Sequence, residues 1–210
     1  MRISTVIKAL LAATAITPLL CQAESNVNTG GGSPLATTAH VDFQIAIPKF
    51  VFLRIGTGPG TVAGGWAAGG SIDLISFAPT PAQVGTGPLA ALAASGDLGN
   101  GTETAVVVAN NGTVTLSSTT TGALSDGTGD NLSFATITTA AAHNTSATTL
   151  AAPALADGVT TSVPIAAVGK IVQQDAKWTY SYSNATIPPA GTYGGVNVNN
   201  GRVTYTASVL

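Results

Sequence analysis

Trp178-Thr179-Tyr180-Ser181-Tyr182-Ser183, close to the C-terminus, is the stretch of sequence that decides the fold. Large aromatic residues alternate in it with small polar ones. Val203-Thr204-Tyr205-Thr206-Ala207-Ser208-Val209 repeats the alternation with other side chains. Successive side chains of a β-strand point to opposite faces of its sheet, so a period of two gives each segment one apolar and one polar face. Both segments are therefore predicted to be half-buried strands.

The same pattern predicts further strands along the chain, at residues 39–47, 50–55, 71–77, 103–109, 113–118 and 131–138, with one or two more between 159 and 172. Asn110-Asn111-Gly112 is typical of a type I′ turn, which predicts that the strands on either side of it form a hairpin. Residues 88–95 are compatible with one or two helical turns, and 139–156 with either loop or helix. Short strands between Gly- and Pro-containing turns predict an all-β fold, an immunoglobulin-like or jelly-roll β-sandwich with long Gly/Ala-rich loops.

Residues 1–23 have the layout of a secretory signal peptide. Arg2 and Lys8 precede or flank a short apolar run over residues 9–20, and Cys21-Gln22-Ala23 is similar to a cleavage site. Residues 24–38, with Gly30-Gly31-Gly32-Ser33, have the composition of a flexible arm. We therefore predict a signal peptide at 1–23, an arm at 24–38 and a single domain at 39–210. The expected location is the periplasm, the cell surface or the extracellular space.

Charge and cysteine content limit the classes of partner. Loss of residues 1–23 would remove two of the seven basic residues, none of the nine acidic residues and the single cysteine, leaving a formal charge of −4. Nucleic acid is an improbable partner for such a chain, because phosphate binding needs clustered Lys and Arg. No apolar run after the signal peptide is long enough for a stable membrane span.

The apolar face of residues 39–47 carries Val41, Phe43, Ile45 and Ile47. Two interpretations of this segment remain open at the level of sequence. It pairs within its own domain as the first strand, which is the slightly favoured interpretation, or it is a possible assembly strand that another copy accepts. In the first case the apolar stripes at the two ends of the chain, with Phe43 and Trp178 among them, share one interior.

Catalytic chemistry finds no support in the sequence, and we predict that the protein is not an enzyme. His40 and His143, the two histidines, lie far apart in sequence, and no motif joins them to a nucleophile and a carboxylate. The acidic residues are scattered in turn-like contexts, where aspartate is favoured for its bonds to nearby backbone. We predict no catalytic residue, no cofactor and no metal site.

Two oxygen-rich loops and one tryptophan are the remaining candidates for ligand contact. Residues 126–131 and 97–103 resemble calcium loops only loosely, since 126–131 lacks the glycine and the later glutamate of an EF-hand. Ordinary turns are the preferred interpretation, and calcium binding stays open. Trp66 lies in a Gly-rich loop and is a possible ligand contact, which makes a monomeric carbohydrate- or ligand-binding module the alternative function.

Pro189-Ala190-Gly191-Thr192-Tyr193-Gly194, followed by the alternating strand at 203–207, resembles the closing strands of bacterial pilin-like and spore-coat-U-like secreted β-sandwich proteins. The resemblance covers roughly the last 35 residues, out to Val209. It implies a structural turn at Gly191 and Tyr193, with Tyr193 bonding backbone as a tyrosine-corner residue. It also implies a fimbria-like or cell-surface subunit that assembles by strand donation, with copies of itself, related subunits and a periplasmic chaperone as possible partners. The paired cysteines of many fimbrial subunits are missing here.

Overall fold

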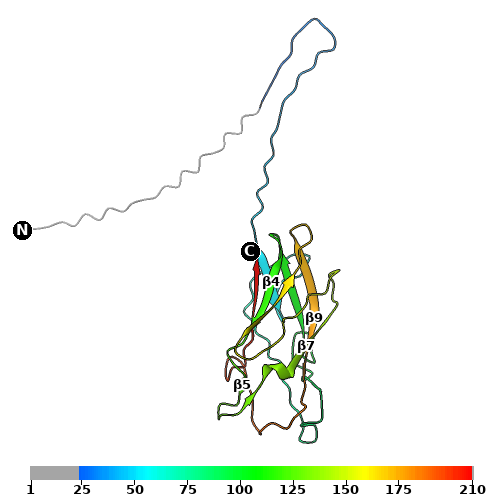
Figure 1. Cartoon of the computed structure of the whole chain (residues 1–210). Coiled ribbons are helices and arrows are strands. Elements are labelled where there is room, and N and C mark those ends of the chain that lie inside the picture. Colours follow the sequence, from blue (N-terminus) through cyan, green and yellow to red (C-terminus); the bar gives the residue numbers. More distant parts are fainter. Residues whose placement is uncertain (1–23, 210) are drawn as a thin grey trace, which may run out of the picture. The chain divides into compact units, whose positions relative to one another are not determined.

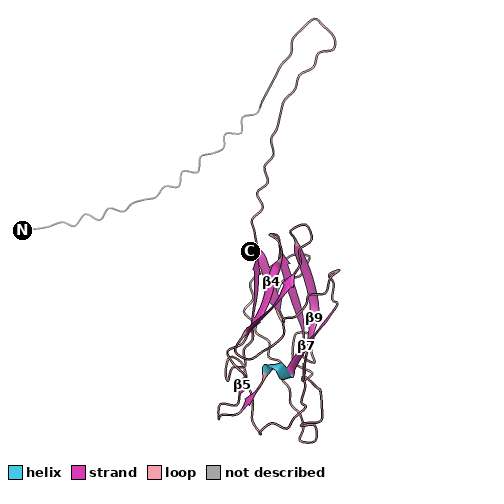
Figure 2. Ribbon diagram, viewed as in Figure 1, coloured by secondary structure: helices cyan, strands magenta, loops and turns pink. Residues whose placement is uncertain are grey.

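The structure is a computed structural model that describes residues 24–209, and residues from Pro48 onward form one compact unit, separate from the segment before it. The predicted signal peptide lies outside the described residues. Regular structure consists of β-strands and one 3-10 turn, Phe134–Thr136 (Figure 2). The strands are β1 Val51–Ile55, β2 Leu89–Ala90, β3 Thr102–Ala109, β4 Val114–Thr119, β5 Leu124–Ser125, β6 Asn131–Leu132, β7 Ile137–Ala142, β8 Thr160–Ile165, β9 Val172–Tyr182 and β10 Thr204–Val209.

Two antiparallel sheets make up most of the compact unit (Figure 1). The first sheet has the order β1-β3-β9-β2, and β7 pairs with the other edge of β9. The second has the order β10-β4-β8, and β5 and β6 form a small separate ribbon. Side chains from both sheets meet in one buried cluster, which includes Val107 of β3, Leu116 of β4, Ile165 of β8 and Trp178 of β9. The predicted all-β sandwich is confirmed.

The interior has two parts, which lie one after the other along β9. The first core cluster is centred on Trp178, which is fully buried and donates its indole N–H to the Leu150 carbonyl at 2.9 Å. The second core cluster contains Phe134, Leu155 and Tyr180. The hydroxyl groups of Tyr180 in the first sheet and Tyr205 in the second lie 3.0 Å apart and join the sheets between the two clusters. The aromatic alternation at 178–182 thus places its large residues inside, as predicted.

The predicted hairpin at 103–118 is wrong in its pairing. β3 and β4 exist, but β3 pairs with β1 and β9, whereas β4 pairs with β10 and β8. Of the three turn residues, only Gly112 has a positive φ, at 118°, so the turn is not type I′. The turn carries the chain from one sheet to the other. Alternation fixes which face of a strand is buried and does not fix the strand with which it pairs.

Three other segments differ from their predictions. Residues 71–77 are extended but join no ladder, and Ser76 instead bonds Ser95 and Leu92. Residues 88–95 contain the two-residue strand β2 and turns in place of helix. The region 131–156 holds β6, the 3-10 turn and β7, and continues as loop beyond Ala142.

Residues 39–47 are not a strand of the sandwich, contrary to the favoured prediction. No ladder forms over them, and the compact unit begins at Pro48 rather than at residue 39. The Phe43 side chain is 90% exposed, whereas Trp178 is fully buried, so the two apolar stripes do not share one interior within a chain. Alternation shows that a segment is able to bury one face, and it leaves open what that face is buried against.

None of the helical structure in residues 24–209 is long and apolar enough to cross a membrane.

Candidate functional site

The two sheets leave an apolar seam along one side of the sandwich, between the edge strands β1 and β10. These strands lie side by side, each with its outer edge unpaired within residues 24–209 (cyan and red in Figure 1). Five of their six inward residues are partly buried and pack against the first core cluster, and the sixth, Val51, is 45% exposed. We call this set the open seam: Val51, Leu53 and Ile55 of β1, with Tyr205, Ala207 and Val209 of β10.

Strand register arranges the open seam in three rows. β1 pairs with β3, so Val51, Leu53 and Ile55 stand opposite Ala109, Val107 and Ala105. β10 pairs with β4, so Val209, Ala207 and Tyr205 stand opposite Val114, Leu116 and Ser118. Counted from the turn that joins β3 to β4, Val51, Leu53 and Ile55 of β1 thus define three rows. On the facing sheet Tyr205 lies one row further along, because its ring packs against Trp178, the register partner of Glu103. Successive rows are two residues apart, about 7 Å along a strand.

A carboxyl group occupies the next position on the same inner face, where the apolar rows end. Glu103 follows Ala105 at an interval of two residues on β3 and is 5% exposed. No hydrogen bond from residues 24–209 reaches its carboxylate. Burial is the main reason why the pKa of Glu103 rises to about 7, and the nearby carboxylates of Asp73 and Asp97 add to the rise. Charging a carboxyl group in so buried a position without a hydrogen-bond partner is costly.

Asp73 lies beside Glu103, just past the end of β1. Its Oδ2 accepts the backbone N–H of Thr57 at 2.6 Å. Gly56, which follows β1, lies against both acids. A Cβ atom at this residue would collide with the Asp73 carboxylate and lie 3.3 Å from Glu103 Cδ. With φ at +76°, Gly56 also has a backbone conformation that other residues rarely adopt. The end of the seam thus carries two neighbouring carboxyl groups, those of Asp73 and Glu103, and we use the name acidic pocket for this pair.

The segment that carries the predicted assembly strand exposes its whole apolar face. Val41, Phe43, Ile45 and Ile47 are 75%, 90%, 86% and 76% exposed. Burial of such a side chain is worth about 1.5–3 kcal/mol. Four of them at intervals of two residues form a stripe with the same spacing as the rows of the open seam. We call residues 39–47 the donor segment.

Asn110 fixes the start of the compact unit. Its side-chain oxygen accepts the N–H of Phe50 at 2.9 Å, and its side-chain nitrogen donates to the Pro48 carbonyl at 2.8 Å. The Asn110 backbone N–H also donates to the Phe50 carbonyl. These bonds extend the pairing of β1 with β3 over residues 48–50 and hold them in line with β1. The role of Asn110 was missed from sequence, because it was assigned to a tight turn.

Trp66, the predicted ligand contact, is held by its own loop. Its Nε1 donates to the Thr61 carbonyl at 2.8 Å, and its ring stacks on Phe50 with centroids 4.5 Å apart. The ring of Phe52 lies next to it in a tilted arrangement, with the two ring centroids 6.4 Å apart. The side chain is 39% exposed. One ring face and the indole N–H are thus already in use, which weakens the case for a binding module centred on Trp66.

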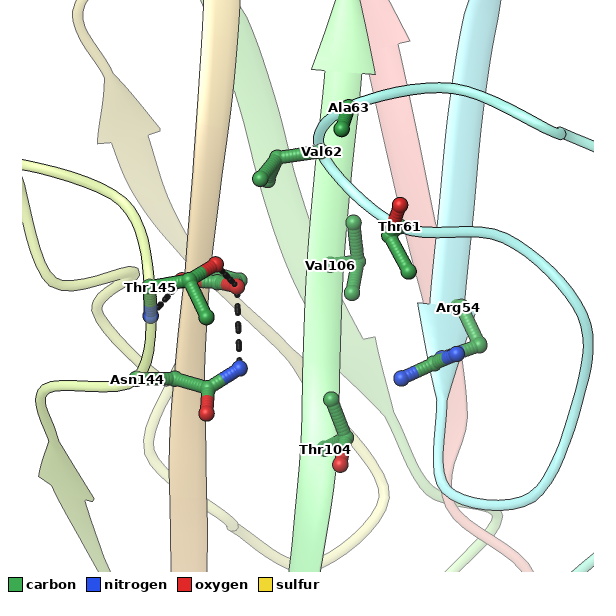
Figure 3. A pocket seen from close by; sticks show the side chains of 9 residues that line it. Arg54, Thr61, Val62, Ala63, Thr104, Val106, Asn144 and Thr145 are labelled. Carbon is green, nitrogen blue, oxygen red and sulfur yellow. Dashed lines mark hydrogen bonds between the residues drawn. The ribbon is translucent and has the colours of Figure 1, made fainter.

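A cavity of about 340 Å³ lies on the outer face of the first sheet, between loops that contain Thr61 and Thr145 (Figure 3). Arg54 and Asp175 stand at its two sides, with Val106 between them by strand register. Arg54 donates through Nη1 to the carbonyls of Gly58 and Gly60, at 3.0 and 2.6 Å. These polar groups hold the loops, and the lining residues include no acid–base pair suited to catalysis.

Asp175 has the same loop-holding role on the other side of this cavity. Its carboxylate accepts bonds from Asn144, Thr145 and Ser146, including both backbone N–H groups of the last two. Burial alone would raise its pKa, but these hydrogen bonds outweigh burial and hold the pKa at about 2. The carboxylate therefore stays charged and fixes the 144–146 loop to β9.

The acidic loops behave as turns. Asp126 accepts the side-chain hydroxyl of Thr128 and the backbone N–H groups of Thr128, Gly129 and Asp130, and these bonds, the hydroxyl bond most of all, lower the pKa of its carboxyl. Asp97 accepts the backbone N–H of Thr104 at 2.8 Å. Over residues 24–209 no cluster of three or more His, Cys, Asp or Glu side chains has the geometry for a metal ion.

The structural turn near the C-terminus has the bond that the tyrosine-corner prediction assigned to it. The Tyr193 hydroxyl donates to the Pro189 carbonyl at 2.8 Å. A Cβ on Gly191 would lie 3.1 Å from the Asp126 side chain and 3.5 Å from the Tyr193 ring, so the turn leaves little room for a larger residue. His40, which sequence placed on a strand face, contacts Glu24 at 2.7 Å within the N-terminal segment.

Comparison of the chain with family models, with curated proteins and with solved structures finds no match.

Proposed function

We propose that this chain is an exported, non-enzymatic structural subunit that assembles by strand donation into a fimbria-like or cell-surface polymer. In this proposal the donor segment of one copy lies in the open seam of the next. One observation carries it: the same chain has four exposed apolar side chains in a stripe, and a seam whose three rows have the matching spacing and remain partly exposed.

Backbone hydrogen bonds would add to this apolar contact. The outer edges of β1 and β10 have unpaired N–H and C=O groups, and an extended peptide pairs readily with such an edge. In the free subunit the same edges invite uncontrolled pairing. A periplasmic chaperone that covers the seam before assembly is therefore a partner that this proposal includes. The predicted signal peptide at 1–23 supports export.

The test is self-association of the chain from residue 24 onward, followed by light scattering. The variant Phe43→Asp with Ile45→Asp places two charges on the apolar face of the donor segment and should remain monomeric. A matched control, Gln44→Asp with Ala46→Asp, adds the same charges to the opposite face and should assemble like the wild type. Equal assembly of both variants would contradict the proposal, as would a wild-type chain that stays monomeric at high concentration.

A further inference from the structure

The donor segment and the open seam each continue into a charged residue at the same spacing. On the donor, Lys49 follows Ile47 at an interval of two, so it extends the stripe of Phe43, Ile45 and Ile47, and it is exposed. In the seam, Glu103 follows the three apolar rows at the same interval. The donor segment and the open seam therefore each present three apolar positions followed by one charged position, and the two charges have opposite signs.

We infer that the acidic pocket of Asp73 and Glu103 binds the Lys49 ammonium group of a second copy of this chain, and that this contact sets the register and direction of the donated strand. The inference rests on the proposed function. Phe43, Ile45 and Ile47 then cover the Val51, Leu53 and Ile55 rows in that order. The donated strand runs in the same direction as β1 and opposite to β10.

A donated strand that ran in the opposite direction would not give Glu103 a charged partner. If the donated strand ran against β1, the row of Glu103 would receive Val41 or Ala39. An apolar side chain there would seal the carboxyl of Glu103 from water without giving it a partner, which is the costly arrangement. His40, the other basic residue of the segment, lies on the face that points away from the seam. Lys49 is thus the cation that the pocket can receive.

The pocket is suited to an ammonium group. Glu103 is nearly fully buried and accepts no bond from residues 24–209, and Asp73 accepts a single backbone N–H from Thr57. An arriving Lys49 would supply the donors that the Glu103 carboxylate lacks. The pKa of Glu103, which burial raises to about 7, would fall on docking, since a neighbouring cation favours the carboxylate.

A peptide-binding experiment separates this inference from the proposed function. The acceptor is the chain from residue 24 onward with Phe43→Asp and Ile45→Asp, which cannot donate, and the ligand is a synthetic peptide of residues 39–49. We expect Lys49→Gln in the peptide to weaken binding roughly ten- to a hundredfold, the range of a charge-assisted hydrogen bond. Against an acceptor that also carries Glu103→Gln, the two peptides should bind almost equally.

Each outcome has a distinct meaning. If the wild-type and Lys49→Gln peptides bound equally to the acceptor that retains Glu103, the Lys49 contact would be overturned and strand donation would remain intact. Absence of binding by either peptide would overturn strand donation itself. A third outcome is that calcium chloride raises the melting temperature of the acceptor and that Glu103→Gln abolishes this rise. That result would identify the acidic pocket as a metal site and would also overturn the inference.

Crosslinking tests the direction independently. The only cysteine of the sequence is Cys21, which the chain from residue 24 onward lacks. An acceptor with Ile55→Cys should form a disulfide with a peptide that carries Ile47→Cys and not with peptides that carry Phe43→Cys or Val41→Cys, the residues that would face Ile55 in a strand running against β1. The reverse preference would overturn the inferred direction.

Discussion

The two core clusters differ in how the chain covers them on the side of β1 and β10. Past the end of β1, the extended residues 71–77 run beside the second cluster, and Ile75 and Phe77 pack against it together with Tyr205. Beside the first cluster no corresponding segment is present in residues 48–209, and the inward residues of β1 and β10 are the last layer. The chain covers one half of its interior with residues 71–77 and leaves the inward residues of β1 and β10 partly exposed over the other half.

This difference links the exposed apolar stripe of residues 39–47 with the partly exposed residues of β1 and β10 that cover the buried first core cluster. Residues 71–77 do in the second cluster, within the chain, what the donor segment is proposed to do in the first cluster between chains. Ile75 and Phe77 also follow the interval of two, as do Phe43 and Ile45. The closed half thus provides an internal reference for the open half.

The largest expected effect is a difference in the free energy of unfolding between two variants, one at the buried Trp178 and one at the exposed Phe43. Trp178→Ala should lower the free energy of unfolding by about 3–5 kcal/mol, because it empties the first core cluster. Phe43→Ala should change it by less than about 0.5 kcal/mol in the monomer, because the side chain has no contacts to lose there. Urea unfolding at low protein concentration measures both. A large cost for Phe43→Ala in the monomer would mean that the arm packs on its own sandwich.

A second prediction concerns Glu103, at the junction of the open and closed halves. Its pKa of about 7 lies above the ordinary value of 4.5, so the folded chain holds a proton that the unfolded chain releases between these pH values. The contribution of Glu103 to the free energy of unfolding should therefore be greatest below pH 4.5 and be lost as pH rises through 7. Glu103→Gln should remove this fall and stabilise the chain by up to about 3 kcal/mol at pH 8, with little effect at pH 4.

Urea unfolding of wild type and Glu103→Gln across this pH range tests the prediction. Thr104→Val, at the next position on the outer face of the same strand, is the control that should leave the pH dependence unchanged. A wild-type stability that stays flat between acid and neutral pH would show that the carboxyl is not buried as described.

Matched truncations on the two halves give a third prediction. Phe77→Ala, on the closed half, should lower the free energy of unfolding by about 2 kcal/mol and leave the affinity for the 39–49 peptide unchanged. Leu53→Ala, in the open seam, should cost about 1 kcal/mol in the monomer and weaken peptide binding by about tenfold, because Leu53 completes its contacts only when the seam is filled. If both variants affected peptide binding equally, the distinction between the halves would not hold.

The smallest effect is expected at the start of β1. Asn110→Ala removes the bonds to Pro48 and Phe50 and should cost about 1 kcal/mol of unfolding free energy. Asn111→Ala, in the same turn, is the control and should be close to neutral. Equal effects would assign the loss to the turn rather than to the bonds that hold residues 48–50.

Much of the fold could be predicted from the sequence, because alternation at 178–182 and 203–209 directly reflects burial of one strand face. β1, β3, β4 and β10 lie within one residue of where the pattern placed them, whereas β9 begins at Val172, before the predicted stretch at 178–183. The partner of β3 could not be predicted from Asn110-Asn111-Gly112, since a tight turn can join two paired strands or carry the chain between sheets. Residues 71–77 have the right period but pack without a ladder, a difference that depends on the strands around them.

Only the donor segment of the candidate site could be predicted from the sequence. The stripe Val41, Phe43, Ile45 and Ile47 is contiguous in sequence and was found there. The open seam is assembled from residues near 53 and 207, which only the folded sheets bring together. Glu103 was counted among scattered carboxylates, because nothing in the sequence shows that its position on β3 is the fourth in an inward row.

The bonds from Asn110 to Pro48 and Phe50 make the peptide link between Ile47 and Pro48 a clean boundary. Everything that the sandwich needs for its own integrity lies on the C-terminal side of that link. In the proposed assembly the nine residues before this link supply the apolar stripe, whereas Lys49 belongs to the sandwich that follows. An exchange of residues 39–47 between subunits would then change the apolar contact and keep the charged one.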